Sequence, residues 1–396
     1  MDSILDSNTV SLLSSTRILL FQRIVPSYRV PVFERLNDEL GIITCHSEAA
    51  IGGVESYAEA MEYRHRFVYG RFLFGRKNVF TQSVLPVLRE LRPRVVICEY
   101  ALGVLTFWKL LLLRPFFRYK LIGWSHGVKN RDMVLDDKTA HYHLTGHILR
   151  WLDAVIIYSS SRREKLAARF PAIRSKLFCA NNTLDISIYS KVYSKYDVSD
   201  REILKNEMGI SHSFNMLFLG RMRREKRIDL IIDVWRSLKQ NHDVGLICIG
   251  DGEERERLLH DSPEEGLHLP GAIHDIEESG KYLTAADVIV NPGYVGLSIV
   301  HAFAFGLPMI TCHSTEEGPF HSPEIEYLKD GYNGFLCDSD AVSIAACIDR
   351  LILDPDLLAR MKANALKTVE EEANIERMIG GFRDAIEYVL HDDDRG

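Results

Sequence analysis

The chain has 396 residues, of which 46% are hydrophobic and 26% are charged, and its formal net charge is −7 at pH 7. That length can form two domains with hydrophobic cores of their own, and that composition excludes a mostly disordered chain. The charge is uneven, because residues 1–200 carry 28 Lys and Arg against 19 Asp and Glu, whereas residues 201–396 carry 20 against 36. The basic half can therefore meet an anionic membrane, a phosphate-bearing substrate or nucleic acid, or it can simply be solvated.

Three features of the sequence bear on where the protein works. The seven cysteines are scattered without a Cys-x-x-Cys motif, so we expect core thiols in a reducing cytosol rather than disulfides or a zinc site. Residues 1–15 lack the basic start and apolar core of a signal peptide, and we expect a polar leader there. Residues 101–117 are the best candidate for a membrane span, but Lys109 and Arg114-Pro115 interrupt them. We expect a cytoplasmic protein that can associate peripherally with the inner face of a membrane.

In the first half, short β-branched and apolar runs alternate with helix-length runs. Strands are predicted at residues 17–22, 41–44, 95–98, 121–124 and 155–158, and helices at residues 32–40 and 104–113. Residues 63–77 mix aromatic residues with basic ones, which is typical of a surface that docks on lipid head groups or bases, and equally of a strand with a wet basic face. The strand at 121–124 leads to a loop with His126.

The same alternation resumes in the second half. Strands at residues 215–219, 244–249 and 267–269 alternate with helices at residues 228–240, 253–260 and 277–286, and a last amphipathic helix is predicted at residues 375–390. Such alternation is typical of a doubly wound parallel sheet, so we predict two Rossmann-like α/β domains. The predicted boundaries are 1–190 for the first domain, 191–205 for a linker, 206–374 for the second domain, and 375–396 for a helix that crosses back to the first.

Residues 288–310, with the sequence VIVNPGYVGLSIVHAFAFGLPMI, have the pattern of strand, glycine turn, helix and strand. The helix is apolar on nearly all sides, so it should be buried. In open α/β sheets, ligands bind where strand ends meet helix starts. The turn that contains Gly293 and Gly296 therefore predicts a binding cleft.

Two cations follow the strand at 215–219. Arg221 lies in the turn after Gly220, and Lys226 lies at the head of the next helix. A helix start favours acidic side chains, so a purely structural role for these cations fits poorly. Two fixed cations beside free backbone N–H groups are what a diphosphate needs in order to be held without a metal.

Several motifs, in a fixed order, resemble one protein family. GRMRREKRIDLII, IGDGEERERL, LPGAI, YLTAADVIVNPGYVGLSIVHAFAFGLPMI and PEIEYLKDGYNGFL resemble the donor-binding half of the family 4 retaining glycosyltransferases, which have the GT-B fold. The first half resembles the same family more loosely, through RILLFQ, YRVPVFERL, GWSHG and ANNTLD. The resemblance implies two Rossmann-like domains that face a cleft, the first binding the acceptor and the second the nucleotide sugar.

The resemblance also implies roles for individual residues. Arg221 and Lys226 would grip the donor diphosphate, and His126 would lie beside the transferred sugar. The loop of Gly271, Ala272 and Ile273 would meet the nucleobase. The donor site would further include Gly293, Val295, Gly296, Leu297 and His301.

One departure from the family concerns Gly293 and His301, which stand where the family carries two glutamates for hydroxyls of the sugar and the ribose. His301 can bind such hydroxyls or be a core histidine. We favour altered recognition, as in a subgroup with PGxVGL…HA at these positions, over lost turnover. We then expect donor sugar, or a side chain of the other domain, in the space above Gly293. The pair of glycines that the family usually has after the first strand is also absent, so residues 27–29 would have to take over its role.

The resemblance implies a hexosyltransferase-like enzyme that acts with retention in cell-surface polysaccharide synthesis. It would move a sugar from a nucleotide diphosphate to a hydroxyl of a glycan or lipid-linked acceptor. Positive charge from Arg221 and Lys226 would stabilise the leaving diphosphate, and we expect no cofactor, metal or nucleic-acid partner. Two alternatives stay open. One is a nucleotide-sugar epimerase of the same fold, and the other is a non-catalytic subunit that binds nucleotide sugar beside a true transferase.

Overall fold

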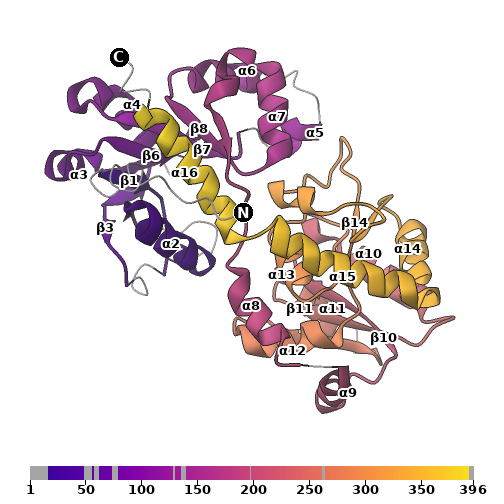
Figure 1. Ribbon diagram of the computed structural model, residues 1–396. Helices are drawn as coiled ribbons and strands as arrows, with labels where there is room; N and C mark the ends of the chain where they lie inside the picture. Colours follow the sequence, from indigo (N-terminus) through magenta and orange to yellow (C-terminus); the bar gives the residue numbers. More distant parts are fainter. Residues whose placement is uncertain are drawn as a thin grey trace. The chain divides into compact units, whose positions relative to one another are not determined.

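A computed structural model describes residues 17–48, 56–57, 62–73, 79–127, 130–134, 140–196, 198–260 and 264–391. The predicted leader at residues 1–15 and the basic end of the 63–77 stretch lie outside these ranges. The chain divides into two compact units. Unit 1 comprises residues 1–129, 137–184 and 375–396, and unit 2 comprises residues 130–136 and 185–374. Each unit contains one large parallel sheet (Figure 1).

The sheet of unit 1 has the described strands in the order β3-β2-β1-β6-β7-β8-β9. Every neighbouring pair is parallel. Its central strands are apolar at nearly every position because helices cover both faces. The strands are β1 (Ile18–Phe21), β2 (Ile42–His46), β3 (His65–Phe67), β6 (Val95–Glu99), β7 (Lys120–Ser125), β8 (Ala154–Ile157) and β9 (Leu177–Cys179), with a separate pair of β4 (Gly70–Phe72) and β5 (Phe80–Gln82).

The helices of unit 1 pack on the two faces of this sheet. On one face, Leu20, Ile97 and Trp124 belong to a core that α2 and α16 complete. On the other face, α4 contacts β6 and β7, and α7 contacts β8 and β9. The helices and turns are η1 (Ser27–Arg29), α2 (Val30–Leu40), α3 (Val84–Leu91), α4 (Leu105–Phe117), α6 (Ala140–Leu149), α7 (Ser160–Arg169), η3 (Pro171–Lys176) and α16 (Ile375–His391), while α5 (Asn130–Val134) groups with unit 2. The last helix of the chain thus completes the core of the first unit.

Helix α4 is longer than the sequence predicts. The predicted helix ends at residue 113, before Arg114-Pro115, but α4 continues through Pro115 to Phe117. A proline near the end of a helix removes one N–H from the final turn, which costs less there than in the interior. Among the described residues, no helix is both long enough and apolar enough to cross a membrane.

The sheet of unit 2 has its described strands in the order β12-β11-β10-β13-β14-β15, again with parallel neighbours. The strands are β10 (Phe214–Leu219), β11 (Val244–Ile249), β12 (Leu267–Gly271), β13 (Val288–Val290), β14 (Met309–Cys312) and β15 (Gly334–Cys337). The order reverses between β10 and β13, where the chain crosses from one half of the sheet to the other. Such a switch point is where open α/β sheets bind ligands.

The helices of unit 2 are α8 (Ile186–Tyr193), α9 (Val198–Glu207), η4 (Arg224–Lys226), α10 (Ile228–Leu238), α11 (Glu253–His260), α12 (Ile276–Ala285), α13 (Ser298–Ala304), η5 (Pro323–Tyr327), α14 (Ala341–Leu353) and α15 (Pro355–Glu371). The predicted linker at 191–205 contains the end of α8 and most of α9. The prediction of a buried helix after Gly296 is confirmed, since Ile299, Val300 and Phe303 of α13 are at most 1% exposed.

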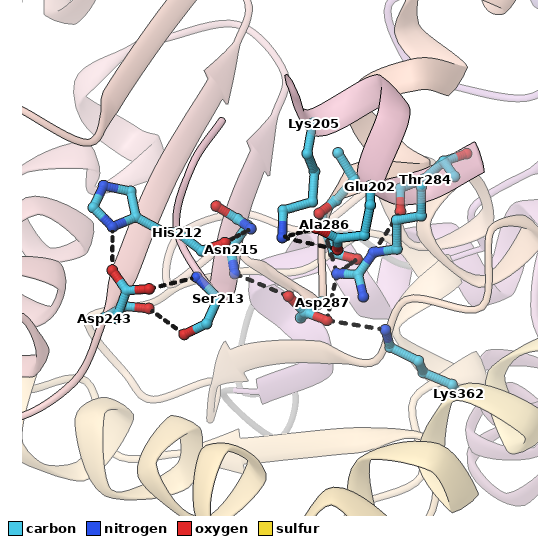
Figure 2. Close-up of polar contacts among 12 residues, drawn as sticks. Glu202, Lys205, His212, Ser213, Asn215, Asp243, Thr284, Ala286, Asp287 and Lys362 are labelled. Atoms are coloured by element: carbon cyan, nitrogen blue, oxygen red, sulfur yellow. Dashed lines mark hydrogen bonds and ion pairs between the residues drawn. The ribbon is translucent and has the colours of Figure 1, made fainter. Parts of the chain in front are cut away.

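A buried carboxylate ties the helices of unit 2 to its sheet (Figure 2). The side chain of Asp287, just before β13, is 5% exposed. One carboxylate oxygen lies 2.6 Å from Nη2 of Arg201 on α9 and 3.2 Å from Nζ of Lys362 on α15. The other oxygen accepts a hydrogen bond of 2.9 Å from the backbone N–H of Asn215 in β10. One side chain therefore connects two helices and two strands.

We expect Asp287→Ala to lower the free energy of unfolding by about 2–4 kcal/mol, because it leaves two partly buried cations and the buried N–H of Asn215 without their carboxylate. Urea denaturation measures this change. A matched control is Glu278→Ala, which removes the exposed partner of Lys281 and should cost less than about 1 kcal/mol. Equal losses in the two variants would contradict a structural role for the Asp287 network.

Candidate functional site

A pocket of about 670 Å³ lies at the carboxyl ends of the unit 2 strands. Four loops line it. Glu225 and Arg227 follow β10, Gly293 and Tyr294 follow β13, residues 315–320 follow β14, and Ser339 follows β15. Parallel strands bring their carboxyl ends to one edge, which explains why loops distant in the sequence meet there.

Lys226 is a partly buried cation beside this pocket, although it is not one of the residues that line it. Its Nζ donates a hydrogen bond to the backbone carbonyl of Tyr294 and lies 4.8 Å from the centre of the Tyr294 ring. Among the described residues, no carboxylate forms an ion pair with Lys226. Burial lowers the pKa of Lys226 to about 8, although the charge of Glu225 acts in the opposite direction. The ammonium group thus lacks both full hydration and a counter-ion.

Arg221 and Arg227 flank Lys226 in the same loop. Arg221 is exposed in the turn after β10, and it is Arg227, rather than Arg221, that lines the pocket. Arg227 has a positive φ of 55° where η4 gives way to α10, and its Nε lies 3.4 Å from a carboxylate oxygen of Asp229. The predicted pair of Arg221 and Lys226 therefore occupies one loop, with an additional arginine that the sequence analysis did not select.

Gly293 packs directly on the backbone of that loop. A Cβ atom at this position would lie 2.2 Å from the carbonyl oxygen of Glu225 and 2.6 Å from Cα of Lys226. The expectation that donor sugar or a facing side chain fills the space above Gly293 is therefore wrong, because the main chain of Glu225 and Lys226 fills it. The glycine permits the close approach that sets the position of Lys226.

His321 is a structural residue of the site that the sequence analysis missed. Its Nδ1 accepts a hydrogen bond of 3.1 Å from the backbone N–H of Val295, and its Nε2 lies 2.8 Å from the carbonyl of Cys312. This pairing requires a neutral ring protonated on Nε2, and burial lowers the pKa of His321 accordingly. Next to it, the hydroxyls of Tyr294 and Ser322 are hydrogen-bonded. These contacts join residues 26 and 28 positions apart in the sequence, so no local motif signals them.

The remaining residues of the predicted donor site form its framework. Val295 is buried, with its N–H bonded to the ring of His321 and its carbonyl accepting from the N–H of Ser322. Gly296 and Leu297 lead into α13. His301 does not line the pocket and instead packs on the ring of Tyr189 in α8, with the ring centroids 4.8 Å apart. Burial lowers the pKa of His301 to about 4, so it is neutral at physiological pH. His301 thus makes the contacts of a core histidine rather than those of a residue that lines the pocket.

The loop of Gly271, Ala272 and Ile273 lies at the same edge of the sheet. The carbonyl of Gly271 accepts a hydrogen bond of 2.9 Å from the N–H of Gly250. Gly250 in turn leaves no room for a side chain, since a Cβ there would lie 1.8 Å from the carbonyl oxygen of Gly220. Glycines therefore bring the loops after β10, β11 and β12 together, with Ala272 exposed beside them.

His126 belongs to unit 1 and follows β7. His126 is exposed to solvent, and its ring lies beside that of Tyr158 with the centroids 4.8 Å apart. The pKa of His126 is lowered to about 4. Restricted hydration of the ring is the main cause, and the positive charges of Arg162 and Arg29 add to it. His126 is thus a neutral ring at the carboxyl edge of the unit 1 sheet.

Arg29 is the residue of the 27–29 turn that enters the core. It is 7% exposed, donates to the side-chain carbonyl of Asn182, and lies 5.5 Å from the centre of the Trp124 ring. Its Nη1 is also 3.4 Å from the sulfur of Met378 in α16. Arg29 therefore fastens the turn after β1 to α16, which is a structural role beyond the one predicted for residues 27–29.

One acidic motif bears on the expectation of a site without a metal. The sequence contains an Asp-x-Asp triplet, Asp338-Ser339-Asp340, a motif that the metal-free prediction took to be absent. Asp340 is the N-cap of α14 and accepts hydrogen bonds from the backbone and hydroxyl of Ser343, each 2.8 Å long. In the described part of the chain, no group of three His, Cys, Asp or Glu side chains could hold a metal ion.

Comparison with known proteins gives this geometry a family context. Residues 200–368 match the model of the family described as "Glycosyl transferases group 1". The N-acetyl-alpha-D-glucosaminyl L-malate synthase of Bacillus anthracis is 26% identical over 217 residues, which are 53% of this chain and 54% of that protein. Spore coat protein SA of Bacillus subtilis (strain 168) is 25% identical over 202 residues, which are 46% of this chain and 50% of that protein. The chain thus matches about half the length of these curated relatives.

Solved structures match over nearly the whole chain. The structure of Anabaena Alr3699/HepE in complex with UDP has a TM-score of 0.68 at 15% identity and covers 94% of this chain and 99% of its own. A glycosyltransferase from Rickettsia africae ESF-5 has a TM-score of 0.69 at 14% identity, with 95% and 99% covered. The chain therefore has the GT-B fold, as predicted. Within that fold, residues 200–368 match the group 1 glycosyltransferase model.

We expect Gly293→Ala to lower the free energy of unfolding by about 1–3 kcal/mol, because its Cβ would displace the backbone of Glu225 and Lys226. Gly296→Ala is the matched control, since a Cβ there meets Tyr294 and Ser322 only at 3.6–4.0 Å. Chemical denaturation of both variants compares them. An equal effect at the two positions would show that Gly293 is not needed for close packing.

Proposed function

We propose that the protein is a glycosyltransferase that moves a sugar from a nucleotide diphosphate donor to a hydroxyl group. The observation that carries this proposal is Lys226, a partly dehydrated ammonium group beside the pocket of the group 1 domain, which no described carboxylate neutralises. An anionic ligand at that pocket would supply the missing counter-charge. A nucleotide diphosphate has the required charge, and its sugar would extend into the pocket.

Charge stabilisation is the central chemical step in this proposal. Cleavage of the bond between sugar and diphosphate places developing negative charge on the leaving phosphate oxygens. Lys226, with Arg221 in the same loop, would stabilise that charge electrostatically, and the partly dry surroundings of Lys226 strengthen the effect. The family resemblance of the sequence implies retention of configuration, and this scheme requires no metal ion.

The related proteins suggest which donors to test first. HepE has been crystallised with UDP, with UDP-glucose, and with UDP and glucose, and one relative is named for the N-acetyl-glucosaminyl product that it forms. These names support a hexose linked to uridine diphosphate as the first candidate donor. In unit 1, the neutral ring of His126 is our candidate for a contact with the transferred sugar.

The proposal extends to the acceptor and the cellular setting of the reaction. We propose a glycan or a lipid-linked acceptor in cell-surface polysaccharide synthesis, with the protein in the cytoplasm or at the inner face of the membrane. We also propose that the protein belongs to the subgroup that has PGxVGL…HA in place of the two glutamates. The close packing of Gly293 on Glu225 and Lys226 supports a rebuilt donor site, because this contact could not form around a glutamate.

Incubation of the purified chain with UDP-glucose, UDP-N-acetylglucosamine, GDP-mannose and a dTDP-sugar tests the proposal. We expect one donor to release free nucleotide diphosphate, slowly with water and faster with a hydroxyl acceptor. Conversion of the donor to a stereoisomer without nucleotide release would identify an epimerase. Donor binding without any turnover would identify a non-catalytic subunit, and either result would overturn the transferase proposal.

We expect Lys226→Ala to lower kcat/KM about 10²–10³-fold, because it removes a group that stabilises the leaving diphosphate. Arg221→Ala should have a smaller effect, and the double variant should lose less than the product of the two, since both cations act on one leaving group. Steady-state kinetics with the active donor measure this.

Lys239→Ala serves as the control for lysine removal. Lys239 also lies over an aromatic ring, with Nζ 4.3 Å from the centre of the Trp235 ring, but it is at the opposite end of α10 from Lys226. We expect kcat/KM of Lys239→Ala to equal that of the wild type. A wild-type rate in Lys226→Ala would contradict the assignment of Lys226.

A further inference from the structure

Helix α4 of unit 1 exposes an apolar stripe to solvent. Leu112 is 72% exposed and Phe116 is 80% exposed, and a spacing of four residues places both on one face of the helix. Phe107 and Leu110 on the buried side face the sheet and are fully buried. The apolar run that is too interrupted to span a membrane therefore leaves part of its surface open to water.

Trp151 extends this stripe across a groove. Its side chain is 54% exposed, in the turn that precedes β8. A cavity of about 530 Å³ lies between Trp151 and the end of α4, with Leu111 and Pro115 among its lining residues. Arg114 fixes the arrangement, since its Nη1 donates to the carbonyl of Trp151 at 2.9 Å and its Nη2 pairs with Asp153 at 2.7 Å.

The surroundings of the stripe are positively charged. Arg114, Arg118 and Lys120 line the cavity beside Trp151, and its lining residues include no Asp or Glu. Arg118 is exposed directly after α4, and among the described residues it forms no ion pair. Isolated apolar side chains on a surface need no explanation, but an apolar stripe with a cationic border marks an interaction site.

We propose that this surface, which we call the α4 face (Leu112, Phe116, Trp151 and Arg118), docks the protein on a bilayer rich in anionic phospholipids. Leu112 and Phe116 would enter the interface between head groups and acyl chains, where such side chains leave water. Trp151 has the amphipathic ring that is favoured at this depth. Arg118 and Lys120 would meet lipid phosphates, and Asp153 is paired with Arg114, so its carboxylate is neutralised.

A second pair of exposed apolar side chains has acidic surroundings, which shows why we assign membrane docking to the α4 face instead. Val342 and Leu353 on α14 are 80% and 69% exposed, comparable with Phe116 and Leu112. Residues 338–356 around them contain five aspartates and one arginine. An anionic bilayer would repel that surface, so the pair provides a control matched in exposure and opposite in charge.

Vesicle co-sedimentation tests the proposal without any measurement of activity. The full chain is mixed with vesicles of phosphatidylcholine alone, or with about a third phosphatidylglycerol, at about 0.05 M and 0.5 M sodium chloride. We expect binding only to the anionic vesicles and at least a tenfold loss of affinity at the higher salt concentration. Absence of binding to anionic vesicles, or equal binding to both compositions, would overturn the proposal.

Variants then locate the contact. Leu112→Ser combined with Phe116→Ser should lower vesicle affinity at least tenfold, whereas Val342→Ser combined with Leu353→Ser should not change it. Arg118→Asn removes the charge and keeps a residue that tolerates the left-handed backbone found there, with φ of 57°. It should weaken binding, whereas Arg360→Asn, at an exposed arginine of α15, should not.

Trp151 provides a direct optical signal. On anionic vesicles the tryptophan emission should shift to shorter wavelength, and Trp151→Phe should abolish the shift while vesicle binding persists. Thermal unfolding of each variant checks that the fold is intact. If the α4 variants bind vesicles like the wild type, or if they instead abolish a concentration-dependent dimer seen by light scattering, the membrane proposal is wrong and the α4 face meets another partner.

Discussion

The structure of the candidate site depends on how Lys226 is held. Its ammonium group lies against the carbonyl and the ring of Tyr294, and its backbone lies against Gly293. Both contacts join the loop after β10 to the loop after β13, at the point where the strand order reverses. The site therefore has a positive charge at a fixed position before any ligand arrives, and such preorganisation is the basis of electrostatic catalysis.

Holding Lys226 in this way has a measurable thermodynamic consequence. The pKa of Lys226 is lowered in the folded protein to about 8, from 10.5 in the unfolded chain. Between these two values the unfolded chain binds more protons than the folded one, so the contribution of Lys226 to stability increases as the pH rises from about 8 to about 10.5. At neutral pH the buried charge is destabilising, and a bound anion would relieve it.

The opposite edge of the unit 2 sheet uses charge differently. Asp287 is surrounded by Arg201, Lys362 and the N–H of Asn215, so each buried charge there has a partner. Lys226 has no such carboxylate among the described residues. The charges around Asp287 neutralise one another, as in a structural network. The charge of Lys226 is not neutralised in this way, as expected of a candidate ligand site.

The sequence predicts those parts of the fold and site that local patterns encode. Apolar runs locate the central strands of both sheets but not the edge strands β9 and β15, and the glycine turn at residues 291–296 contains Gly293, which packs on Lys226. Helix α9 has no apolar period because polar contacts hold it, with Arg201 donating to the carbonyls of Thr284, Ala285 and Ala286. The role of His321 is also absent from the local sequence, since its partners lie in other loops.

The pKa of the Lys226 ammonium group, measured by NMR with and without UDP, tests the central claim most directly. We predict a value of about 8 in the free protein and an increase of at least about one unit when UDP is bound, because a nearby diphosphate favours the charged form. A pKa that stays constant while UDP binds would contradict the claim that Lys226 holds the diphosphate.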